Sequence, residues 1–244
     1  MSDLDLSRLT IQEKKRLHAL LTESVFQGEV LPAILNGDGI RPAPLCWMQE
    51  CTKSYDEKWK AHGFDGPYQP FSRLPYLPWL LNLLMTEKRL LIPKSREMLV
   101  SWCAIGYAVW LCQIRPRTRV IVQTQKEGKA IDLIKGAGVP GYGRTLYEQQ
   151  SERLKQEFPL TKPMEDQPSD AISWKNGSIL QGVPSGADQI RLYHPTVVIF
   201  DEAAHLEDFQ DSWAAAQPVA QQMIAVSSVA QGTFWDWCRR PAAT

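Results

Sequence analysis

The stretch TVVIFDEAAH, residues Thr196 to His205, places five apolar or β-branched residues directly before two adjacent carboxylates. A continuous apolar run of this length predicts a strand that is buried on both faces, as strands of a parallel sheet are. The two acids then lie at the carboxyl end of the strand. In open α/β sheets this is the end at which ligands bind.

Adjacent acids at a strand end suit the chemistry of nucleotide hydrolysis. Asp201 would hold a Mg²⁺ ion directly or through water, and Glu202 would orient and deprotonate the attacking water. The alternative is a buried strand that ends in a solvated acidic turn. The choice depends on whether the chain also supplies a loop that binds phosphate.

A second stretch fits such a loop. Arg89 to Pro93 reads as a buried strand, the polar turn KSREMLVS follows at residues 94–101, and an apolar helix runs to about Gln113. In this order the first backbone N–H groups of the helix, and its dipole, face the turn. The turn lacks both glycines and the lysine of the GxxxxGK[ST] pattern. Ser101 stands where a Mg²⁺-contacting hydroxyl belongs, and Lys94 and Arg96 supply positive charge. A basic turn before a helix remains the alternative.

Composition is that of an ordinary globular protein, with 44% hydrophobic and 22% charged residues in a chain of 244. The formal net charge is zero, but residues 86–129 carry nine Lys or Arg and three acids, whereas residues 201–212 carry five acids and no Lys or Arg. The five cysteines contain no CxxC motif and are expected to be reduced thiols. The four scattered histidines argue against a zinc site. We expect no signal peptide and no membrane span.

Strands that alternate with helices predict a mostly parallel α/β sheet. Residues 171–175 and 178–183, joined at Asn176-Gly177, predict a β-hairpin that is an insertion or an antiparallel edge. Two domain segments are expected, an N-terminal appendage over residues 1–75 and a main domain over 76–244. The remaining predicted strands are residues 118–124 and 222–229, the remaining predicted helices are residues 7–24, 78–84, 126–134, 147–158, 209–217 and 234–238, and a glycine-rich loop is expected over residues 136–143.

Five segments together resemble the ATPase domain of the large terminase subunit of tailed bacteriophages. They are RLLIPKSREMLVSW, RVIVQTQ, NGSILQGVPSGADQIR, VVIFDEAAH and AVSSVAQGTFWDWC, in the order found in that family, over about residues 65–240. The first resembles the variant phosphate loop of the family, the fourth its Walker B strand, and the fifth its coupling motif. The resemblance implies a RecA-like P-loop fold with an additional catalytic glutamate.

The resemblance also implies roles for individual residues. Asp201 would be the metal carboxylate, Glu202 would polarise water, and Ser101 would help to hold Mg²⁺. Ser227 and Ser228 would sense the γ-phosphate. The ATP-binding loop would comprise Lys94, Ser95, Arg96, Glu97, Met98, Leu99, Val100 and Ser101.

Three further residues have two readings each. Tyr76 would stack on adenine, or it is a partly buried aromatic beside a proline. Arg144 would act in trans as an arginine finger, or it is a surface arginine at a helix start. Arg191 would contact DNA phosphate or a neighbouring subunit, or it forms a structural ion pair.

The implied activity is hydrolysis of ATP with Mg²⁺ to drive double-stranded DNA into a procapsid. The implied partners are the portal protein, the small terminase subunit and further copies in a ring on the portal, with a monomer in isolation left open. The implied location is the host cytoplasm. Two departures qualify this picture. Leu99 replaces the usual glycine, and the nuclease domain of the family is not expected in this chain, so we expect no DNA cleavage. The alternatives are a non-hydrolysing assembly module with a degenerate ATPase fold and a helicase-like ATPase.

Overall fold

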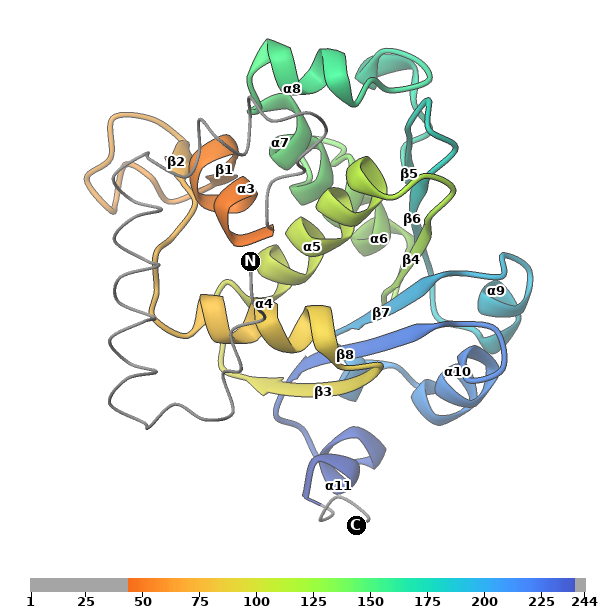
Figure 1. The fold of residues 1–244 in the computed structure, drawn as a ribbon. Helices are drawn as coiled ribbons and strands as arrows, with labels where there is room; N and C mark the ends of the chain where they lie inside the picture. Colours follow the sequence, from red (N-terminus) through yellow and green to blue (C-terminus); the bar gives the residue numbers. More distant parts are fainter. Residues whose placement is uncertain (1–43, 240–244) are drawn as a thin grey trace, which may run out of the picture.

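The computed structural model describes residues 44–239 and has a central six-stranded sheet with helices on both faces (Figure 1). The strand order is β3-β8-β7-β4-β6-β5. All neighbouring pairs are parallel except β5 and β6. The predicted mostly parallel α/β sheet and its antiparallel hairpin are therefore confirmed. The strands are β3 (Arg89–Lys94), β4 (Arg119–Gln123), β5 (Ala171–Ser173), β6 (Ile179–Val183), β7 (Val197–Asp201) and β8 (Gln222–Ser228).

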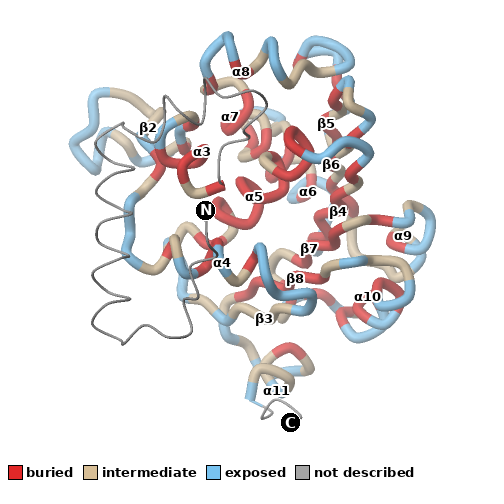
Figure 2. Tube along the Cα trace, in the orientation of Figure 1, coloured by how far each residue is buried: buried red, intermediate tan, exposed pale blue. Residues whose placement is uncertain are grey.

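Strand β7 shows why its continuous apolar run is needed. Val197 and Ile199 belong to a buried cluster on one face of the sheet, and Val198 and Phe200 belong to a second cluster on the other face. Successive side chains of a strand point to opposite faces. When helices cover both faces, every side chain of the strand is buried, which favours an apolar residue at each position. The burial of this strand is visible in Figure 2.

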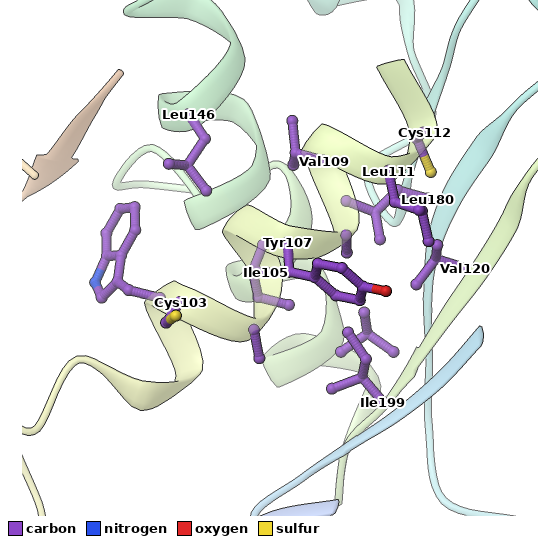
Figure 3. Close-up of a cluster of buried hydrophobic side chains, with 14 of the residues drawn as sticks. Cys103, Ile105, Tyr107, Val109, Leu111, Cys112, Val120, Leu146, Leu180 and Ile199 are labelled. Carbon is purple, nitrogen blue, oxygen red and sulfur yellow. The ribbon is translucent and has the colours of Figure 1, made fainter. Parts of the chain in front are cut away.

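Helices cover the two faces unequally. The larger cluster packs α5 against the sheet. In Figure 3, Leu111 of α5 lies beside Leu180 and Val120 of the strands, and Val109 points to the other side of the helix. The smaller cluster joins the opposite face to α10 and α11 through an aromatic group that includes Phe209, Trp213 and Phe234. The helices from residue 77 onward are α4 (Leu77–Thr86), α5 (Val100–Ile114), α6 (Glu127–Ile134), α7 (Tyr142–Glu148), α8 (Glu152–Glu157), α9 (Ala187–Arg191), α10 (Phe209–Ala216) and α11 (Thr233–Arg239), with short 3-10 turns η2 (Met164–Asp166) and η3 (Ala203–His205).

The described part of the predicted N-terminal appendage consists of helix α3 (Pro44–Cys51) and a two-stranded ribbon of β1 (Lys53–Tyr55) and β2 (Tyr68–Pro70). Trp47 and Met48 of α3 join the buried cluster of α5. Gly106 of α5 allows this contact, because a Cβ there would lie 2.8 Å from the Met48 Cε. The domain boundary at residue 75 stays a prediction, and the helix expected at residues 7–24 lies outside the described residues.

Some predicted elements differ from the structure. The helix expected over residues 147–158 is two helices, α7 and α8, because the chain leaves the helix at Gln149 and Ser151 starts a new one by accepting a hydrogen bond from the Leu154 amide. The glycine-rich loop expected to reach Gly143 ends at Gly141, since α7 begins at Tyr142. Strands β1 and β2 and the short helix α9 were not predicted. Within residues 44–239 no helix is both long and apolar enough to cross a lipid bilayer.

Candidate active site

Parallel pairing brings the ends of three strands together. Lys94, the last residue of β3, is in register with Ser228 of β8, and Asp201 of β7 is in register with Val226 two positions before it. The phosphate-loop turn, the two acids and the two serines therefore meet at the carboxyl edge of the sheet. This is the edge at which the sequence places a ligand.

The turn between β3 and α5 holds an unusual backbone. Glu97 and Leu99 both have positive φ angles, 62° and 54°. A non-glycine residue in this left-handed region costs about 1–2 kcal/mol. Leu99 keeps the conformation that a glycine would adopt freely, and its side chain packs against the large buried cluster. Tyr76 stabilises the turn by donating a hydrogen bond from its hydroxyl to the Met98 carbonyl.

Lys94 and Glu202 form an ion pair across the mouth of the site. The Lys94 Nζ lies 2.6 Å from the Glu202 Oε1, and the two side chains are 10% and 29% exposed. Glu202 itself has φ +52° and begins η3, so that its side chain turns back toward the phosphate-loop turn. In this arrangement the lysine ammonium offsets the negative charge of the carboxylate.

Ser101 connects the first turn of α5 to the end of β7. Its hydroxyl donates to the Asp201 Oδ1 at 2.7 Å. Burial raises the pKa of Asp201, the hydrogen bond from Ser101 lowers it, and the nearby Glu202 charge raises it again, with a net raised pKa. A carboxylate and a hydroxyl side by side are hard oxygen donors of the kind that Mg²⁺ prefers. A divalent cation here would offset the burial of the Asp201 charge, so the two residues fit the metal.

Four hydrogen-bond donors surround Glu202. Burial alone would raise its pKa, but the hydrogen bonds from Lys94 and from the Ser228 backbone amide outweigh it and lower the pKa to about 2. The Ser228 amide and hydroxyl donate to the Glu202 Oε2 at 3.1 and 2.9 Å. The Ser227 hydroxyl donates to the same oxygen at 3.3 Å and accepts from the Ala204 amide at 3.0 Å. The end of β8 is thereby tied to the turn that carries Glu202.

His205 adds a contact that the sequence interpretation did not assign. Its Nε2 lies 3.2 Å from the Ser228 hydroxyl and 4.0 Å from the Glu202 Oε2. Because Ser228 donates its proton to Glu202, the neutral tautomer that fits carries its proton on Nε2. The only sequence signal was its position three residues after Glu202, in the same short turn.

Two connected cavities flank the phosphate-loop turn. The first, which we call the ribbon cavity, has a volume of about 700 Å³ and lies between β1–β2 and the turn. The second, the carboxylate cavity, has a volume of about 690 Å³ and contains Asp201 and Glu202. They share Tyr55, Glu57, Lys94, Ser101, Trp102 and Tyr142 in their walls. A ligand that extends over the turn could occupy both.

The shared wall is largely aromatic. The rings of Trp102 and Tyr142 stack with centroids 3.9 Å apart and planes 10° apart. Gly136 positions Tyr142 by closing the turn before α7 at φ +80°, where a Cβ would lie 1.9 Å from the Val139 carbonyl oxygen. Neither aromatic residue was predicted as part of the site, because the pairing depends on a turn from a distant segment. Lys129 also lines the carboxylate cavity and was likewise missed.

The predicted site residues fall into three groups. Lys94, Glu97, Met98, Leu99, Val100 and Ser101 line one or both cavities, as do Asp201 and Glu202. Ser227 and Ser228 contact Glu202 directly. Tyr76, Ser95 and Arg96 are not among the lining residues, although Arg96 is exposed at the adjoining turn.

The two predicted arginines of the interface lie away from these cavities. The Arg144 Nε donates to the Glu148 Oε1 at 2.9 Å within α7, and this hydrogen bond raises the arginine pKa. Arg191 pairs with Asp188 at 2.9 Å on α9, with both side chains largely exposed. Each arginine thus has a partner within its own helix. Either pair would have to open before the guanidinium could reach a second molecule.

Comparisons with known proteins support the fold. The structure is similar to the crystal structure of the large terminase of bacteriophage HK97, with a TM-score of 0.50 and 11% sequence identity, over 78% of this chain and 37% of that chain. It is also similar to a point mutant of the large terminase ATPase domain of Thermus phage P74-26, with a TM-score of 0.48 and 16% identity, over 76% and 74% of the two chains. No family model matches the sequence. No curated protein matches it in sequence either.

Proposed function

We propose that this chain is the ATP-hydrolysing domain of a viral DNA-packaging motor, the large subunit of a terminase. The observation that carries the proposal is the convergence of Lys94, Ser101, Asp201 and Glu202 at one sheet edge, beside a cavity large enough for a nucleotide. The likeness in fold to the HK97 large terminase supports the same assignment. The motor would translocate double-stranded DNA in the host cytoplasm.

The triphosphate would lie over the turn that joins β3 to α5. The amino end of a 15-residue helix and the ammonium of Lys94 favour anionic oxygens there. Arg96, exposed at the turn, would contact the outer phosphate oxygens. The nucleoside would extend into the ribbon cavity, against Tyr55 and Leu99. Tyr76, which the sequence suggested for stacking, would instead hold the turn through Met98.

Asp201 and Ser101 would hold Mg²⁺ at the end of β7. The ion would supply charge neutralisation on the phosphate oxygens. The Ser101 oxygen would offer a lone pair to the ion while its proton stays donated to Asp201. The paired carboxylate and hydroxyl are therefore held close together before any ligand arrives.

Glu202 would act as the general base that orients and deprotonates water. Its present pKa of about 2 makes it a weak base. A bound phosphate attracts the Lys94 ammonium, and when that ion pair opens, the burial of Glu202 raises its pKa. The lysine would thus move from the carboxylate to the nucleotide, which activates the base only when substrate is present.

The other parts of the proposal concern assembly. Ser227 and Ser228, at the end of β8, would shift when phosphate is lost, since both contact Glu202. Arg144 would complete the site of a neighbouring copy in a ring, after its pair with Glu148 opens. The ring would form on the portal protein and receive DNA from the small terminase subunit.

A second candidate function rests on Leu99. Its side chain stands where a close approach of backbone to phosphate favours glycine, and its left-handed backbone is strained. A degenerate ATPase fold that serves only for assembly with the portal or small subunit would retain this residue without cost to its function. A helicase-like ATPase is the third candidate, and it shares the acidic strand end at Asp201 and Glu202.

Nucleotide binding separates these candidates. We expect the full chain to bind a fluorescent ATP analogue with Mg²⁺, and Asp201→Asn to lose the Mg²⁺-dependent part of the affinity. Lys162→Ala serves as the matched control, because Lys162 is exposed and lines neither cavity. Absence of nucleotide binding by the wild-type chain would favour the assembly module. Stimulation of hydrolysis by procapsids, and not by free DNA alone, would favour the packaging motor over a helicase.

A further inference from the structure

Exposed cations lie at the amino ends of the parallel strands. This edge of the sheet is opposite to the carboxyl edge that carries the candidate active site. Arg89 starts β3 and Lys88 directly precedes it, Arg115 and Arg117 precede β4, and Lys175 precedes β6. Because β3, β4 and β6 belong to one parallel set, these five residues lie along the same edge. We call them the basic edge.

Two interlocked turns hold three members of the basic edge. The Arg117 amide donates to the Asn176 carbonyl at 3.1 Å, and the Ser178 hydroxyl donates to the Arg115 carbonyl at 2.7 Å. The Asn176 side-chain amide also donates to the last carbonyls of α5, those of Cys112 and Gln113. Arg115, Arg117 and Lys175 therefore project from a backbone that is fixed on both sides.

These cations are not neutralised by the residues that the structure describes. None of the five has an acidic partner within 4.0 Å among residues 44–239, and all are exposed. Some exposed cations elsewhere are paired, since Lys155 pairs with Glu152 and Arg191 with Asp188. Two acids lie close to these cations. Glu87 is the neighbour of Lys88 in the sequence, and Glu157 lines the same cavity as Lys175. The chain as a whole has zero net charge, whereas this edge carries five exposed cations.

The spacing of the basic edge suits an extended polyanion. Strands β8 and β7 lie between β3 and β4, so three strand spacings separate the two groups of cations, about 14 Å in all. Double-stranded DNA carries one charge per about 1.7 Å of its axis, so a surface of this width faces several phosphates. Flexible lysine and arginine side chains contact phosphates without reading sequence.

We infer that the basic edge is a contact surface for the phosphate backbone of double-stranded DNA, bound without sequence preference. The choice of duplex DNA as the polyanion rests on the proposed function. Nucleotide and DNA would then lie at opposite ends of the same strands. Helix α5 joins them directly, because it begins at the phosphate-loop turn and ends one residue before Arg115. A displacement of that turn would move α5 and the arginines at its far end together.

The test compares two charge-reversal variants of the full chain that have the same net charge. The edge variant is Arg115→Glu, Arg117→Glu and Lys175→Glu. The control variant is Lys53→Glu, Lys60→Glu and Lys162→Glu, three exposed lysines from other parts of the described chain. Fluorescence anisotropy with a labelled mixed-sequence duplex is measured between about 50 and 200 mM KCl. Circular dichroism checks the fold. If the edge variant does not fold, the same three positions are changed to Gln.

We expect the edge variant to lose at least about tenfold in affinity, with the slope of log K against log salt reduced by about 2–3, and the control variant to stay within about twofold of wild type. Equal losses in the two variants, or a wild-type chain that does not bind the duplex at low salt, would overturn the inference. ATP binding, measured in parallel, separates the two proposals. A wild-type chain that binds DNA through the basic edge but binds no nucleotide would contradict the motor and leave the edge standing.

Discussion

Lys94 and Glu202 are 108 residues apart in sequence, yet the Lys94 Nζ lies 2.6 Å from a Glu202 carboxylate oxygen. The contact links the strand that begins the phosphate-loop turn to the turn that follows β7. In the proposed reaction Lys94 binds phosphate and Glu202 binds water, so this contact has to open before either residue can act. The ion pair is therefore a ground state that ATP has to open, and its consequences can be measured.

The low pKa of Glu202 predicts a stability contribution that depends on pH. A carboxyl group whose pKa is depressed in the folded state, here to about 2 from an ordinary 4.5, stabilises the fold above the ordinary pKa. This contribution is lost as the pH falls from about 4.5 to about 2. Glu202→Gln should therefore unfold at lower urea concentration than wild type at pH 7, and the difference should shrink below about pH 4.5. A difference that is constant between pH 7 and pH 3 would contradict the pairing.

Asp201 should behave in the opposite way. Burial raises its pKa, so its charged form is disfavoured in the folded state and stability falls as the pH rises above the ordinary value near 3.8. Without metal at pH 7, Asp201→Asn should raise the melting temperature, by about 2–4 °C if the relief is about 1 kcal/mol. Mg²⁺ should raise the melting temperature of the wild type and not of the variant. A variant that melts below the wild type in EDTA would count against the buried charge.

Substitutions at Leu99 separate backbone strain from side-chain packing. Leu99→Ala removes most of the side chain and keeps a Cβ in the left-handed region, whereas Leu99→Gly removes both. The glycine variant should therefore exceed the alanine variant in unfolding free energy by about 1 kcal/mol, measured by urea denaturation. The glycine variant should also bind ATP more tightly than either wild type or the alanine variant, because the backbone can approach the phosphates. Equal ATP affinities of the three proteins would show that Leu99 does not hinder nucleotide.

His205 offers a prediction for the turn beyond Glu202. Its Nε2 contacts the Ser228 hydroxyl, which in turn donates to Glu202. His205→Ala should lower kcat about tenfold, by about 1.4 kcal/mol, with little change in KM, because the hydrogen bond positions the base and does not touch the nucleotide. His205→Gln, whose amide can donate in place of Nε2, should recover part of the rate. A change confined to KM would instead place His205 in nucleotide binding.

The sequence predicts the parallel sheet well for a physical reason. Strand β7 is apolar at every position before its final aspartate because both of its faces are buried, and this pattern can be read without a structure. The carboxylates after it and the serines at the end of β8 lie at one edge because parallel strands all end there. The direct contacts of Ser227 and Ser228 with Glu202 follow from that register.

The parts of the site that escape sequence reasoning depend on contacts between distant segments. Tyr142 stacks on Trp102 only because the turn closed by Gly136 and Gly141 returns to α5. The ribbon of β1 and β2 has only three residues in each strand and lies in a stretch rich in glycine and proline, so its periodicity is too short to detect. The Lys94–Glu202 pair could not be predicted either, since residue types alone do not say which charges meet before ligand binds.

The most direct test of the central claim is ATP hydrolysis by the full chain with Mg²⁺, at high protein concentration, for wild type, Lys94→Ala and Glu202→Gln. The account predicts that the wild type turns over ATP and that Glu202→Gln binds ATP but loses at least about a hundredfold in kcat, roughly 2.7 kcal/mol. Lys94→Ala should lose both affinity and rate. Hydrolysis by Glu202→Gln at the wild-type rate would contradict the assignment of Glu202 as the base, and with it the proposed active site.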